Sequence, residues 1–234
     1  MQTPTMNTPV SKCLELATYV IRMLGKFSTN VVLTALAAEM TAAKNHLAAL
    51  QNDYEVAVEA ILPARVDVKY ENHVSDRRIR LTQQKVEIAD GKKGGRIGVL
   101  VFPEGSTPIT RLVGDSQIRA MSDLEGRLQS VETLWPDAAE EKTDIGKHRD
   151  NYALALKHRN DVAQNVRNKR ALRQAAKEAF ITKYAEIASR VAAEFPRDTA
   201  MQDLFFDDVR SASALAQADE NESESGNSEN TTSG

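Results

Sequence analysis

The chain has 234 residues, of which 30 are basic and 33 acidic, so its formal net charge is −3. This near balance gives no reason to expect nucleic-acid or membrane binding from composition alone. Cys13 is the only cysteine, which excludes an intramolecular disulfide and a thiolate cluster for zinc or iron–sulfur. We therefore expect a reducing, cytoplasmic location.

Aromatic residues make up only 5% of the chain, and small apolar side chains suit closely packed helices. Residues 1–9 have little to bury and are predicted to be a flexible arm. Over residues 10–24, apolar side chains recur at intervals of three and four, which predicts an amphipathic helix that ends near Gly25. Glu15 and Arg22 interrupt this stretch, so it is a poor candidate for a signal peptide or a membrane span.

A second helix is predicted to begin at Ser28 or Thr29, because either side chain can cap its first turn. Its apolar residues alternate at intervals of four and three, as the pairing of two helices requires. These residues are Val32, Leu36, Met40, Ala43, Leu47, Leu50, Tyr54, Ala57 and Ile61.

Pro63 interrupts this pattern, because proline lacks a backbone N–H and crowds the preceding turn. Either the helix ends near Ala60 and a hairpin follows, or the helix kinks and resumes. The apolar residues of a resumed helix are Val66, Tyr70, Ile79 and Val86. We favour the kink, because no glycine, Asn-Gly or serine-rich turn accompanies the proline.

Residues 90–95 contain three glycines and break the pattern. The apolar run that follows, residues 96–102, is the only convincing β-like segment, and Pro103 stops it. A single strand cannot satisfy its own backbone groups. We therefore expect it to pair with another chain or to lie as an extended tongue against the helices.

The second half of the chain is predicted to be helical again. Residues 116–132 form one amphipathic stretch, and the run from Lys147 to Phe195 contains neither glycine nor proline, which predicts one long helix. Asp198 can cap a last short helix. Residues 217–234 carry no apolar side chain after Ala218, which predicts a disordered acidic tail.

The two halves resemble each other weakly, since a long helical stretch meets a Phe-Pro pair in both. Residues 28–131 and 137–216 are therefore candidates for an internal duplication, with chance recurrence in alanine-rich helices as the alternative. The predicted fold class is all-α. We expect an elongated bundle of two long antiparallel helices within one helical domain, residues 10–216, with short flanking helices and a β-like insertion.

No motif indicates a reaction centre. None of the four histidines follows a glutamate by three residues, as di-iron bundles require. Asp144 and His148 can share a helix face, but such a pair is usually a surface salt bridge. The glycines of residues 91–98 lack the Gly-Lys-Ser/Thr ending of a phosphate loop. The sequence therefore predicts no catalytic, cofactor or metal site, and a protein that is not an enzyme.

We expect a structural or adaptor protein that associates with itself or with a protein partner through its helices, in a homo-oligomer. The predicted contacts are Val32, Leu36, Met40, Leu47, Leu50, Ile61, Ile97, Val99 and Val101. One alternative is a nucleic-acid binder that uses the basic residues of 157–177, in particular Arg167, Lys169, Arg170 and Arg173. Another is a membrane-acting protein that inserts residues 97–102, which resembles helical pore-forming toxins in architecture alone.

Overall fold

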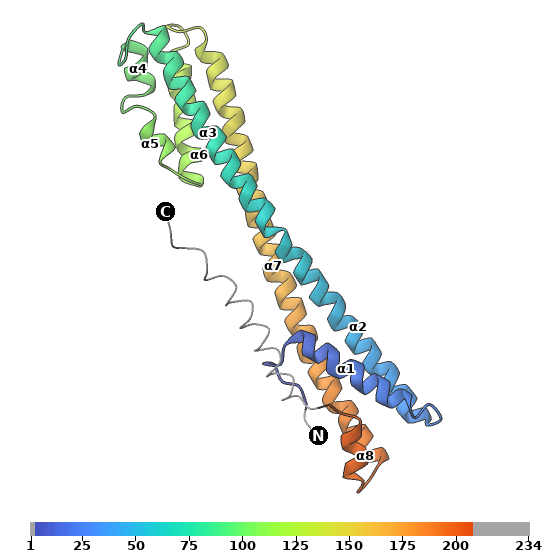
Figure 1. Ribbon diagram of the computed structural model, residues 1–234. Helices are drawn as coiled ribbons and strands as arrows, with labels where there is room; N and C mark the ends of the chain where they lie inside the picture. The colour runs from blue at the N-terminus through green and yellow to red at the C-terminus, as the bar shows by residue number, and fades with distance from the viewer. Residues whose placement is uncertain (1–2, 208–234) are drawn as a thin grey trace, which may run out of the picture. The chain divides into compact units, whose positions relative to one another are not determined.

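A computed structural model describes residues 3–207, and the regular secondary structure of this part of the chain is entirely helical, without a β-strand (Figure 1). The prediction of an all-α bundle is confirmed. In chain order the helices are α1 (Val10–Gly25), α2 (Val31–Glu59), α3 (Ile61–Ala89), α4 (Arg96–Val101), α5 (Thr107–Thr110), α6 (Asp115–Ser130), α7 (Ala138–Glu194) and α8 (Thr199–Leu204). The predicted acidic tail, residues 217–234, lies outside the described residues.

The first long helix continues past its proline. Only Ala60 separates α2 from α3, and it keeps right-handed helical angles of φ −67° and ψ −14°. Pro63 falls in the first turn of α3, where a backbone N–H is not needed. α2 and α3 therefore form one joined helix of 59 residues, and the hairpin alternative is wrong.

The second long helix, α7, contains the predicted run up to Glu194 and begins before it, at Ala138. Gly146, which directly precedes the predicted run, lies inside the helix. A Cβ atom at Gly146 would lie 3.3 Å from Oε2 of Glu125 on α6. The missing side chain thus permits a close approach of α6 and does not end α7. The helix ends just before Pro196, as predicted.

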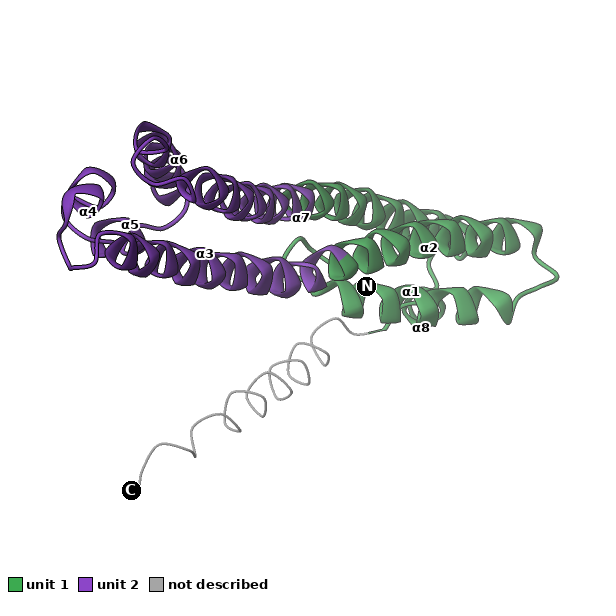
Figure 2. Ribbon diagram, turned by 90° about the horizontal axis from the view of Figure 1, so that it is seen from above, with its two compact units in different colours: residues 1–56, 167–234 green, residues 57–166 purple. Residues whose placement is uncertain are grey.

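The chain divides into two compact units (Figure 2), of which unit 1 comprises residues 1–56 and 167–234. Here α2 and α7 run antiparallel, because Glu39 pairs with Lys183 whereas Asp53, further along α2, pairs with Lys169. Its core is formed by Leu16, Val20, Leu24, Leu36, Met40, Leu47, Phe180, Tyr184, Ile187 and Phe205, among others. Full burial of a side chain of this size contributes about 1.5–3 kcal/mol.

The start of α2 differs from the prediction, because its cap is Asn30. The Asn30 Oδ1 atom accepts hydrogen bonds from the backbone N–H groups of Val32 and Leu33, at 2.9 and 3.2 Å. Ser28 and Thr29 lie before this cap. The first fully buried apolar residue of α2 is then Leu33, and Val32 is 39% exposed.

Unit 2 comprises residues 57–166, in which α3 and α7 again run antiparallel. Ser75 Oγ donates to the carbonyl oxygen of His148, and Thr82 donates to Glu141. The helices α4 and α5 pack against the C-terminal part of α3, and α6 packs against α4 and α5 (Figure 1). Its core includes Ile79, Val86, Ile97, Val101, Met121, Leu124, Leu128, Trp135 and Ile145.

The predicted β-like insertion is wrong, because residues 96–101 form helix α4. Asp90 explains the difference: its carboxylate accepts hydrogen bonds from the N–H groups of Ile97 and Gly98, at 3.0 and 2.7 Å. An anion at this end also favours the helix dipole. Ile97 and Val101, four residues apart, then share one helix face and are buried in the core of unit 2.

The apolar line of α3 also differs from the prediction. Its buried residues are Ala64, Ser75, Ile79, Thr82 and Val86. Val66 and Tyr70, which were expected to continue the core pattern, are 57% and 63% exposed. Within residues 3–207, no helix has both the length and the apolar content needed to cross a membrane.

Candidate functional site

The most unusual surface of unit 2 is a row of exposed apolar side chains on α3, which at Tyr70 borders a hollow that Leu154 and His158 of α7 also line. Leu62, Val66 and Tyr70 are spaced four residues apart and are 66%, 57% and 63% exposed. Buried Ala64 and Ile79 lie on the opposite side of the same helix. Large apolar side chains at helical spacing on a solvent-facing side indicate a contact surface, because exposed apolar groups gain free energy when they are covered.

Charged residues continue this surface at both ends. Glu59 precedes Leu62 by three residues, and His73 and Arg77 follow Tyr70 by three and seven. All three charged or titratable side chains are exposed. We call the six residues Glu59, Leu62, Val66, Tyr70, His73 and Arg77 the α3 outer face. It is acidic at one end, apolar in the middle and basic at the other end.

The local packing explains why this surface is open. The side-chain hydrogen bonds that join α3 and its C-cap to α4, α5 and α6 come from Asp76, Gln83 and Asp90. All three residues follow the apolar part of the outer face. The N-terminal half of α3 therefore presents its outer side without a covering helix within unit 2.

The residues predicted from the α2 pattern lie mostly inside the protein. Leu36, Met40 and Leu47 are fully buried in the core of unit 1. Leu50 and Ile61 are half-buried. On α4, Ile97 and Val101 are buried, whereas Val99 is 57% exposed. Of the predicted contact residues, Val32 and Val99 are thus the ones classed as exposed.

The predicted basic face of α7 is partly engaged within unit 1. Lys169 Nζ lies 2.6 Å from Oδ2 of Asp53. The Arg173 guanidinium lies 4.1 Å from the ring centre of Tyr54, a cation–π contact. Arg167 and Arg170 are exposed. Nucleic-acid binding by this face stays a prediction.

The most deeply buried charge of unit 2 is Glu141, which is 1% exposed. Its carboxylate pairs with Lys85, and its Oε2 atom lies 2.7 Å from both Arg78 Nη2 and Thr82 Oγ1. Burial raises the pKa of Glu141, but hydrogen bonds from Lys85 and Thr82 and the charge of Arg78 outweigh it. The pKa is therefore below its ordinary value, and this cluster joins α3 to α7.

Asp144 and His148, which the sequence analysis considered as a pair, have different surroundings in the structure. Asp144 Oδ2 lies 2.9 Å from Nη2 of Arg78. Burial, together with the positive charge of Arg78, lowers the pKa of His148 below its ordinary value, which favours neutral imidazole. Across the described residues, no group of three or more His, Cys, Asp or Glu side chains is placed to hold a metal ion.

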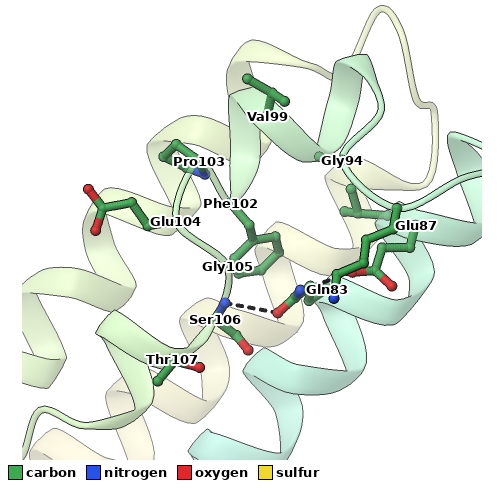
Figure 3. A pocket seen from close by; sticks show the side chains of 13 residues that line it. Gln83, Glu87, Gly94, Val99, Phe102, Pro103, Glu104, Gly105, Ser106 and Thr107 are labelled. Carbon is green, nitrogen blue, oxygen red and sulfur yellow. Dashed lines mark hydrogen bonds between the residues drawn. The ribbon is translucent and has the colours of Figure 1, made fainter.

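A hollow of about 410 Å³ lies between α3 and the segment that joins α4 to α5 (Figure 3). Its wall is fixed by the Gln83 side chain, whose Oε1 accepts a 2.8 Å hydrogen bond from the backbone N–H of Ser106. Gln83 Nε2 in turn donates to Glu87. Phe102 contributes an apolar side chain to this otherwise mixed lining.

No family model, curated protein or solved structure matches this chain. The functional interpretation therefore rests on the surfaces described above. The sequence did not reveal the α3 outer face, because its apolar residues could equally have belonged to the buried side of the helix. The near-symmetric order of acidic, apolar and basic residues around Val66 is the sequence feature that could have indicated it.

Proposed function

We propose that this protein is a non-catalytic structural or adaptor protein that associates with a second copy of itself through the α3 outer face. One observation carries the proposal: three exposed apolar residues on one helix side lie between charges of opposite sign. Such a surface is complementary to itself when two copies meet antiparallel, as a twofold interface requires.

The register follows from the spacing. If Val66 lies on the twofold axis, residues equally far from it on either side face each other. Leu62 of one copy then faces Tyr70 of the other, and Glu59 faces His73, with Arg77 one turn further along. The apolar side chains meet in the middle, and the acidic end of each copy lies against His73 of the other, with Arg77 one turn beyond it.

The two kinds of contact have different roles. Covering Leu62, Val66 and Tyr70 removes apolar surface from water, which supplies the favourable free energy. The charge pairs at the ends are exposed and contribute at most about 1 kcal/mol each. They select the antiparallel register, because a parallel pairing would place Glu59 against Glu59 and Arg77 against Arg77.

Replacement of Val66 by lysine tests the proposal. Two lysines would meet at the twofold axis, so we expect Val66→Lys to shift the mass measured by light scattering from twice the chain mass of 25.8 kDa to the chain mass itself. Val99→Lys is a matched control, because Val99 on α4 is also 57% exposed.

The control variant should keep the mass of the unmodified protein. If Val99→Lys were monomeric while Val66→Lys still associated, the contact would lie on α4, and this would contradict the proposal. A chain that is monomeric before any substitution would also contradict it. Circular dichroism of both variants should match that of the unmodified chain, because both side chains point to solvent.

A further inference from the structure

A second hollow in unit 2, about 340 Å³ in volume, has a lining rich in positive charge. It lies between α3, α7 and the residues that join α5 to α6. Arg65 and Lys69 contribute from successive turns of α3, and Arg159 contributes from α7. No acidic side chain belongs to this lining. We call it the basic hollow.

The three cations lack carboxylate partners in the part of the chain that the structure describes. Arg159 donates to the neutral Oδ1 of Asn160, and neither Arg65 nor Lys69 belongs to a salt bridge there. Elsewhere in unit 2 comparable cations are paired, as Arg149 is with Glu125 at 2.8 Å. Convergent cations without acidic partners create a positive potential that favours an anion.

The hollow also contains polar groups that are held in place. Tyr152 is 2% exposed, and its hydroxyl oxygen accepts a 2.8 Å hydrogen bond from the backbone N–H of Gly114. The hydroxyl hydrogen remains able to donate. Asn72, also in the lining, has a buried Oδ1 atom without a hydrogen-bond partner. This atom is an acceptor, so it calls for a donor group or a water and not for a phosphate oxygen.

The segment that joins α5 to α6 contains a glycine where it borders the basic hollow. Gly114 has φ 64°, a left-handed conformation that residues with a side chain rarely adopt. Val113 beside it is 69% exposed and belongs to the lining, together with the buried Leu156 of α7. The hollow thus combines an apolar wall with cations and a phenol donor.

We propose that the basic hollow binds a small molecule that carries a phosphate group on an apolar body. A phosphate monoester has up to two negative charges and three acceptor oxygens, which match cations from two helices and the Tyr152 hydroxyl. A group with a single negative charge would neutralise them less well. The apolar body would lie against Val113 and Leu156. This site is separate from the α3 outer face and does not depend on self-association.

The test is a titration followed by proton–nitrogen NMR at constant ionic strength, with phenyl phosphate as the probe. We expect saturable shifts of the Val113 and Gly114 amide signals. Inorganic phosphate should bind more weakly at the same signals, because it lacks the ring. Benzenesulfonate, with the ring but one negative charge, should bind at least tenfold more weakly than phenyl phosphate. Equal affinity for these two compounds would overturn the assignment of a phosphate ligand.

A pair of double variants separates a formed site from general charge attraction. Arg65→Gln with Arg159→Gln should weaken phenyl phosphate binding at least tenfold. The matched control, Arg96→Gln with Arg119→Gln, removes the same charge from exposed positions of unit 2 outside the hollow, and its affinity should stay within twofold. Equal weakening in both double variants, or no saturable shift at Val113 and Gly114, would overturn the proposal.

Discussion

Two buried tyrosines show how differently the same hydroxyl group acts in this protein. Tyr152 accepts a hydrogen bond from Gly114, whereas the Tyr184 hydroxyl in unit 1 is buried without a hydrogen-bond partner in the described structure. Burial raises the pKa of Tyr184 well above its ordinary value, so it stays protonated. An unpaired buried hydroxyl costs free energy that a phenyl ring would not.

We therefore expect Tyr184→Phe to stabilise the protein by about 1 kcal/mol and Tyr152→Phe to destabilise it by about the same amount. Urea unfolding of the two variants measures both effects. The two substitutions remove the same atom, so each serves as a control for the other. A loss of stability in Tyr184→Phe would show that its hydroxyl has a partner after all.

Of the charged residues that join α3 to α7, Glu141 contributes most to their pairing. Replacement by glutamine leaves Arg78 and Lys85 without their shared carboxylate, and loss of one partner of a buried ion pair costs about 3–5 kcal/mol. We expect Glu141→Gln to lower the free energy of unfolding by about 3 kcal/mol. Glu140→Gln, at the exposed neighbouring position, should change it by less than about 0.5 kcal/mol.

The contribution of Glu141 also depends on pH. Because its pKa is lowered in the folded protein from the ordinary value of 4.5, its stabilising effect is present above that pH and is lost as the pH falls through the folded pKa. Unfolding midpoints measured between neutral and acidic pH should therefore fall less steeply in Glu141→Gln. A parallel decline in both proteins would contradict the assigned interactions.

At the scale of the helices, the spacing of apolar residues and the positions of glycine and proline were sufficient to predict most of the helices. The joined α2 and α3, the long α7 and the Asp198 cap of α8 agree with their patterns. The errors have specific causes. A glycine such as Gly146 predicts a helix boundary in the sequence, because the close approach of Glu125 is known only from the fold. The apolar run of residues 96–102 predicts a strand, because the Asp90 cap acts across a turn.

The cap of α4 gives a test at this scale. Asp90→Ala removes the acceptor of two N–H groups, so we expect a loss of about 1–2 kcal/mol in stability. Amide hydrogen exchange at Val99 and Phe102, which bond to carbonyls of the first turns, should become faster. Asp123→Ala, at an exposed position of α6, is the control. Unchanged exchange in Asp90→Ala would show that α4 forms without its cap.

For the whole molecule, the sequence correctly predicted that two long helices would pair, and several residues that it assigned to an interaction surface are buried in the core of unit 1. Leu36, Met40 and Leu47 satisfy a coiled-coil pattern, and this pattern is used inside the chain against α7. A pattern cannot distinguish a partner in the same chain from a second copy. The α3 outer face became visible only once the buried side of α3 was known from Ala64, Ile79 and Val86.

Self-association through this face is tested most directly by exchanging its charges. Glu59→Arg alone would remove the carboxylate that faces His73, and His73→Glu alone would place two carboxylates opposite each other, whereas the double variant restores opposite charges with their positions exchanged. Both positions are exposed, so none of the variants should disturb the fold.

Sedimentation equilibrium of the unmodified chain, the two single variants and the double variant is the decisive measurement. The account predicts a dimer for the unmodified chain, weaker association in each single variant, and recovery of the dimer in the double variant. Four identical masses, or two weakened single variants without recovery in the double variant, would contradict it.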